Sequence, residues 1–183
     1  MLTTPVPIFL IFLISCADSG SKPENDTIKV EDDYIFLKYT FYMDQDENLF
    51  EKKYFAIDEI GQERKHFFDS TMFFGEYPNR ASLKGIIDIE SFKELEDTPF
   101  SHDNNHVYYV QATSDGHKRW IVEKADPKTF VPLDYRWGKD GENIFWQTEI
   151  VDGADLETFK INEAFTDSAS DKNSHYLNGK GKN

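Results

Sequence analysis

The sequence predicts an α+β fold: tandem repeats of a β-hairpin followed by a short capped helix, stacked into one β-rich domain. Two short patterns that alternate along the chain support this prediction. An aromatic content of 15% supplies material for a core. Each repeat is too small to fold alone, so neighbouring repeats must stack to bury their shared apolar faces.

The first pattern is an Asp, then two or three polar residues, then a pair of aromatic residues. The Asp and its polar followers suit a tight turn, and the aromatic residues suit a strand. Because neighbouring strand residues point to opposite faces, one ring of each pair is expected to be buried and the other exposed. The copies are residues 103–109 (DNNHVYY), 140–146 (DGENIFW) and 171–177 (DKNSHYL), with a degenerate copy at 69–74 (DSTMFF).

The aromatic pairs supply the candidate ligand-binding residues. Tyr108, Phe145 and Trp146 could stack on a sugar or a peptide if their rings are exposed. Burial in the core is the simpler alternative for each of these rings.

The second pattern is a small or apolar residue, Asp, two variable residues, Ser or Thr, then Phe. It predicts the start of a helix, with the Asp as N-cap and the flanking apolar residues as a hydrophobic staple. Pro127 suits the first helical position, and Pro132 limits the middle helix to about one turn. The copies are residues 87–92 (IDIESF), 125–130 (ADPKTF) and 154–159 (ADLETF).

Together these patterns resemble the DKNYY family, a set of bacterial proteins, many with lipoprotein signals, whose repeats are named for this motif. The resemblance covers about residues 69–177. No single copy spells the full motif, since Ser174 and His175 precede Tyr176 in the copy that begins Asp-Lys-Asn. The resemblance implies no activity, and therefore no catalytic residues.

The N-terminus predicts a lipoprotein signal over residues 1–16. The apolar run at residues 8–14 is far shorter than the ~20 residues of a membrane-spanning helix and fits a secretory signal. The run ends in Leu-Ile-Ser-Cys, which resembles the bacterial lipobox, so Cys16, the only cysteine, is the candidate lipid-attachment site. The first five residues lack the usual basic charge, and an apolar tail with an unmodified thiol is the alternative.

The rest of the chain divides into three segments. Residues 17–27 are small and polar, as in a flexible tether. Residues 28–68 form an N-terminal β-rich segment, with period-two alternation up to Met43, a polar turn at 44–48 and short strands at 54–57 and 66–68. Residues 69–183 form the repeat region.

The net charge of −14 argues against nucleic acid as a partner and permits a cationic one. The expected partners are a membrane, through the lipid anchor, and an envelope protein or glycan. His102 and His106 lie in a predicted turn, where a zinc site is not expected. The Asp- and Asn-rich turns could offer oxygen ligands to calcium, but turn capping explains them more simply.

No phosphate-binding loop, nucleophile elbow or Cys–His pair is present in the sequence. The sequence therefore predicts no catalytic residue, no metal and no cofactor. The expected function is that of a non-catalytic cell-envelope lipoprotein, a binding or scaffold module on a lipid anchor. An immunity-type protein that neutralises a basic toxin and an envelope hydrolase are the alternatives.

Overall fold

The computed structural model describes residues 30–31, 33–54, 66–114 and 116–182, and this part of the chain is almost entirely β. Strands make up 46% of these residues and helix 2%. The helical residues form one 3-10 turn at Leu83–Gly85. The predicted α+β class is therefore wrong. Within the described residues, no helix has the length and hydropathy that crossing a membrane requires.

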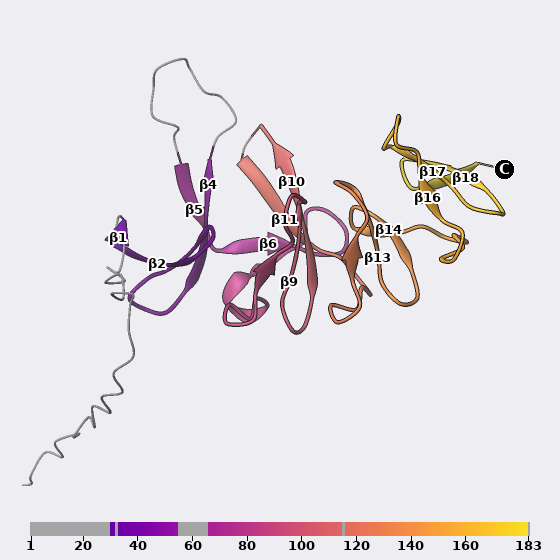
Figure 1. The fold of residues 1–183 in the computed structure, drawn as a ribbon. Helices are drawn as coiled ribbons and strands as arrows, with labels where there is room; N and C mark the ends of the chain where they lie inside the picture. The colour runs from indigo at the N-terminus through magenta and orange to yellow at the C-terminus, as the bar shows by residue number, and fades with distance from the viewer. Residues whose placement is uncertain (1–29, 32, 55–65, 115, 183) are drawn as a thin grey trace, which may run out of the picture.

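The strands form four sheets that follow one another in chain order across the molecule (Figure 1). The first sheet contains β1 (Val30–Glu31), β2 (Tyr34–Lys38), β3 (Phe41–Met43), β4 (Leu49–Tyr54) and β5 (His66–Asp69). The second contains β7 (Arg80–Ser82), β6 (Thr71–Phe73), β11 (Gly116–Ile121), β10 (Val107–Thr113), β9 (Phe100–His102) and β8 (Lys93–Glu94), in that spatial order.

The third and fourth sheets have four strands each, and both are antiparallel meanders. The third contains β12 (Val131–Pro132), β13 (Trp137–Lys139), β14 (Ile144–Trp146) and β15 (Glu149–Ile150). The fourth contains β16 (Lys160–Ile161), β17 (Ser168–Ser170), β18 (His175–Leu177) and β19 (Lys180–Lys182). Strands β8–β11 and β2–β5 form the same meander in the second and first sheets.

An Asp-led turn joins the second and third strands of every meander. Backbone bonds close these turns, from Asp103 N to His106 O, Asp140 N to Asn143 O and Asp171 N to Ser174 O. In the first sheet Asp44 N bonds Asn48 O, one residue further on. The structure thus places the earliest equivalent turn at Asp44, inside the predicted N-terminal segment. Asp69, the expected degenerate copy, instead ends β5.

The second pattern forms a single turn rather than a helix. The Phe amide of each copy donates to the carbonyl of the Asp four residues earlier, at 3.0 Å in all three copies. A strand begins directly after the Phe each time, at β8, β12 and β16. The expected capped helices are therefore wrong, although the capping contacts exist. Thr158 N donates to Asp155 Oδ1 at 3.1 Å, for example.

The two patterns are joined by a reciprocal pair of hydrogen bonds in each repeat. The amide of the second-pattern Asp donates to the carboxylate of the turn Asp, and the amide after the turn Asp donates to the second-pattern hydroxyl. The first bond measures 2.9 Å for Asp88–Asp103, 3.0 Å for Asp126–Asp140 and 2.6 Å for Asp155–Asp171. The second measures 3.0 Å for Asn104–Ser91, 3.2 Å for Gly141–Thr129 and 3.1 Å for Lys172–Thr158.

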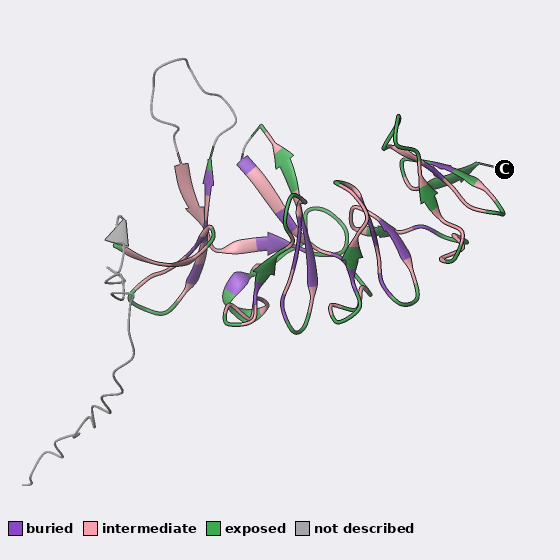
Figure 2. Cartoon of the chain, viewed as in Figure 1, coloured by how far each residue is buried: buried purple, intermediate pink, exposed green. Residues whose placement is uncertain are grey.

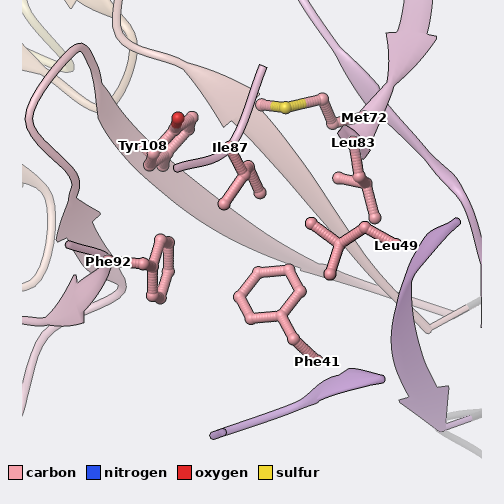
Figure 3. Close-up of a cluster of buried hydrophobic side chains, with 7 residues drawn as sticks. All are labelled: Phe41, Leu49, Met72, Leu83, Ile87, Phe92 and Tyr108. Carbon is pink, nitrogen blue, oxygen red and sulfur yellow. The ribbon is translucent and has the colours of Figure 1, made fainter. Parts of the chain in front are cut away.

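Three hydrophobic cores lie at the junctions between successive sheets, and buried residues run along the facing strands (Figure 2). The first core joins the first and second sheets through Phe41, Leu49, Met72, Leu83, Ile87, Phe92 and Tyr108 (Figure 3). The second contains Phe100, Val107, Tyr109, Val122, Phe130 and Phe145. The third contains Trp137, Ile144, Val151, Ala169 and Tyr176.

This stacking explains the aromatic pairs. Tyr108 belongs to the first core and Tyr109 to the second, because adjacent strand residues point to opposite faces of the sheet. Phe145 and Trp146 divide between the second and third cores in the same way. Inner sheets have neighbours on both faces, so both rings pack inward. Among the described residues no sheet follows the fourth, and there Leu177 replaces the second aromatic residue with 39% of its surface exposed.

Candidate functional site

The structure separates the sequence-predicted site residues. Cys16 lies outside the described residues. Tyr108 and Phe145 are both 0% exposed, so neither ring presents a face to a ligand. Trp146 is partly exposed; it packs edge-on against Trp137 with 4.7 Å between ring centroids. A ligand-binding role for Trp146 stays a prediction.

An open groove of about 580 Å³ lies at the junction of the first and second sheets. Its floor is formed by side chains of β10 and β11, including His117 and Arg119. The loop between β8 and β9 forms one wall, and the turn at Tyr39 forms another. Tyr39 is 44% exposed, and Tyr135, which reaches the groove from the third sheet, is 58% exposed.

A buried cluster of charged side chains lies under this floor. Glu51 is 0% exposed, and its Oε1 accepts bonds from Arg119 Nη2 at 2.6 Å and from Arg119 Nε at 3.0 Å. His117 Nε2 lies 2.9 Å from the same oxygen. Lys53 Nζ lies 3.8 Å from Glu51 Oε2 and 3.0 Å from Asp69 Oδ2. The cluster therefore bridges β4, β5 and β11 across the sheet junction.

The electrostatics of the cluster hold Glu51 ionised. Burial alone would raise the pKa of Glu51, but the charge of Arg119 and the hydrogen bond from His117 outweigh it, so the pKa lies well below its usual range. The Arg119 guanidinium is also flanked by the rings of Phe41 and Phe92, each 5.2 Å away. Buried charges need such partners, so Glu51 and Arg119 act as a joint between sheets rather than as groups free for acid–base chemistry.

Sequence patterns missed Glu51 because it occupies a position that is aromatic in two of the other three repeats. Backbone bonds to the preceding strand align Lys52, Val110, Gln147 and Asn178 as equivalent residues. Glu51 therefore corresponds to Tyr109, Trp146 and Leu177. The available signal was the alternation of Leu49, Glu51 and Lys53 toward one face of β4. From the sequence alone, this alternation is typical of a strand face exposed to solvent. The partner that allows Glu51 to be buried is Arg119, which lies 68 residues further along the chain.

The described part of the chain holds no group of three or more His, Cys, Asp or Glu side chains placed to bind a metal ion. The turn carboxylates that the sequence offered as calcium ligands are taken up by turn bonds: Asp103 Oδ1 accepts the amides of Asn105 and His106 at 2.7 and 2.8 Å. His102 contributes only a contact of 3.3 Å from Nδ1 to the Asp103 carbonyl oxygen.

Comparison with known proteins gives one match. The family model described as the DKNYY family matches residues 22–180. The match extends well before residue 69, in agreement with a first meander that contains the Asp44 turn. No curated protein and no solved structure matches the chain.

Proposed function

The chain belongs to the DKNYY family, and from that premise we propose that it is a non-catalytic binding module, anchored by lipid on Cys16 in a bacterial cell envelope. The lipobox-like segment and the polar residues 17–27 support the anchor. A row of stacked sheets offers a long lateral surface on which a partner can bind.

The state of the ionisable groups supports a non-catalytic role. Glu51, His117 and Arg119 are the titratable groups nearest the groove floor, and they bond to one another. A general base must reach the proton it removes, and Glu51 Oε1 is already shared by three donors. These bonds support a structural role for the cluster at the junction.

The acidic and aromatic side chains at the groove rim are the observation that most directly supports a binding role. Glu94, at the end of β8, and Glu96 and Asp97, on the loop after it, are all exposed and line the groove. Two exposed tyrosines, Tyr39 and Tyr135, lie on the same groove. Carboxylates attract Lys and Arg, and tyrosine faces bind cations and alkyl chains. The groove thus suits a cationic segment of an envelope protein.

A peptide titration tests the groove. We expect a fluorescent oligolysine peptide to bind the full chain, and binding to weaken at least about tenfold when Glu94, Glu96 and Asp97 are replaced by Gln, Gln and Asn. The matched control replaces Glu142, Glu157 and Glu163, which are exposed elsewhere, by Gln, with the same change in net charge. Equal weakening in the two triple variants would show that binding depends only on net charge, and would contradict the groove as the peptide-binding site.

Metabolic labelling tests the anchor separately. Cells given a radioactive fatty acid are expected to label the wild-type chain and not the Cys16→Ser variant. Absence of label from the wild type, or equal label on the variant, would contradict the anchor without affecting the groove.

The acidic rim also favours the second candidate, an immunity-type protein that neutralises a basic toxin. A toxin encoded beside this chain would be inhibited at a stoichiometric dose, and the triple groove variant would lose that inhibition. Inhibition that survives the triple variant would exclude the groove as the toxin site.

A further inference from the structure

A second pocket lies on the opposite face of the second sheet from the charged cluster. It has a volume of about 300 Å³. Trp120 lines it, whereas its strand neighbour Arg119 reaches the buried cluster on the other face. Alternation along β11 therefore separates the two sites.

The floor of this pocket belongs to a row of side chains that crosses four strands. The pairing register places Arg80 beside Phe73, Phe73 beside Trp120, and Trp120 beside Tyr109. The rings of Phe73 and Trp120 stack with 4.8 Å between centroids. The third sheet covers Tyr109 at one end of this row, while Trp120 lies at the pocket.

Two loops form the walls. On one side the loop after β6 brings Glu76 and Tyr77 to the pocket, and Tyr77 is 65% exposed. On the other side the hairpin between β14 and β15 brings Gln147, Thr148 and Glu149. The Tyr77 ring stacks on Phe73, with 5.6 Å between centroids and 17° between planes, and Lys118 Nζ lies 5.1 Å from its centroid. These contacts hold Tyr77 in place at the wall.

The floor also contains an unsatisfied donor. Trp120 Nε1 is buried and has no hydrogen-bond partner among the described residues. A buried donor without a partner is costly, so a small shift of the Trp120 ring that brings Nε1 to a ligand oxygen would be favoured.

From this geometry we propose that the pocket binds one neutral sugar ring of a glycan, with Trp120 and Tyr77 as its aromatic surfaces. Sugar rings have apolar C–H faces that pack on aromatic rings, and hydroxyl groups that both donate and accept hydrogen bonds. The rim supplies both kinds of partner, with the amides of Gln111 and Gln147, the Thr148 hydroxyl and the carboxylates of Glu76 and Glu149. The small volume of about 300 Å³ suits a single ring better than an extended peptide, which needs a long trough or a free strand edge.

The experiment titrates the full chain with glucose, galactose, mannose and N-acetylglucosamine, and follows the indole N–H signals of its Trp residues by NMR. We expect at least one sugar to shift the Trp120 signal saturably, while the signals of Trp137 and Trp146, in the third core, stay unchanged. Tyr77→Ala and Gln111→Ala are expected to weaken this binding at least about tenfold.

Tyr54→Ala is the matched control, because Tyr54 is an exposed tyrosine on β4 that lines neither the pocket nor the groove, and its loss should leave sugar binding unchanged. Trp120→Phe keeps an aromatic floor and removes the donor, so we expect weaker binding by calorimetry in a folded protein. The proposal fails if no sugar shifts the Trp120 signal, or if Tyr54→Ala weakens binding as much as Tyr77→Ala. It also fails if a proline-rich peptide binds with dependence on Tyr77 and no sugar does. None of these outcomes depends on the lipid anchor or the groove.

Discussion

At the residue scale, the turn Asp is the most heavily bonded side chain of the repeat. The Asp103 carboxylate accepts two turn amides, the Asp88 amide from the neighbouring pattern, and the Tyr108 hydroxyl at 2.6 Å. Asp171 repeats this set with the Asp155 amide and the Tyr176 hydroxyl. One carboxylate thus fixes the turn, the second pattern and the first ring of the aromatic pair.

Replacing Asp103 by Ala should therefore destabilise the fold strongly. The change leaves four donors without their acceptor in a site where Asp103 is 1% exposed, so we expect a loss of about 3 kcal/mol in the free energy of unfolding. Chemical denaturation measures it. Asp152→Ala, at an exposed position, is the control and should change stability by less than about 0.5 kcal/mol. A neutral Asp103→Ala would contradict this role of the carboxylate.

Asp171 predicts a pH dependence. Burial raises its pKa, but the amides of Asp155 and Asn173 and the Tyr176 hydroxyl outweigh it and lower the pKa to about 2, from an ordinary value of 3.8. A carboxyl group whose pKa is lower in the folded state stabilises the fold above its unfolded pKa. That stabilisation is lost as the pH falls from about 4 toward 2.

Urea unfolding of wild type and Asp171→Asn at several pH values measures this. We expect the variant to be less stable near neutral pH, and the difference to shrink as the pH falls below about 4. A difference that stays constant down to about pH 2 would mean that the charge of Asp171 contributes nothing.

At the element scale, the structure shows which sequence signals were sufficient. The Asp turns and the strands after them were predicted correctly at 103, 140 and 171, because turn chemistry is encoded in three or four adjacent residues. The capping signal at Asp126 and Asp155 was correct, but such a signal does not distinguish a single turn from a longer helix. The turn is not extended into a helix because a strand starts directly after Phe130 and another directly after Phe159. Both strands pair with residues further along the chain.

The candidate sites were not predictable by such local signals. The burial of Glu51 is explained by its hydrogen-bonded ion pair with Arg119. The proposed sugar pocket is explained by the strand register that aligns Phe73, Trp120 and Tyr109. Both require sheet pairings between distant segments, including the parallel pairing of β6 with β11. The sequence shows that the chain contains many tyrosines and tryptophans, but the stacking of the sheets determines which of these side chains are exposed.

Close packing against β13 predicts a steric effect at Gly138. A Cβ at this position would overlap the ring of Phe130, which lies in the second core. We therefore expect Gly138→Ala to destabilise the protein by about 1–3 kcal/mol, measured by thermal unfolding. Gly85→Ala is the control, because a Cβ there meets nothing within 4 Å. Equal melting temperatures for the two variants would contradict the packing at β13.

At the scale of the whole molecule, each repeat forms one layer, and residues of the neighbouring layers complete its hydrophobic cores. Each core takes residues from two successive sheets, so inner sheets are buried on both faces. The fourth sheet ends the row with His175 and Leu177 exposed on β18 and with an exposed β19 (Figure 2).

The central claim is that the second residue of each aromatic pair contacts the next sheet. Equilibrium unfolding of Tyr109→Ala and Leu177→Ala tests it, because the two residues occupy equivalent positions in an inner sheet and in the last one. We predict a loss of about 3 kcal/mol for Tyr109→Ala, which is 4% exposed in the second core, and less than about 0.5 kcal/mol for Leu177→Ala. Equal losses in the two variants, or a neutral Tyr109→Ala, would contradict the stacked arrangement.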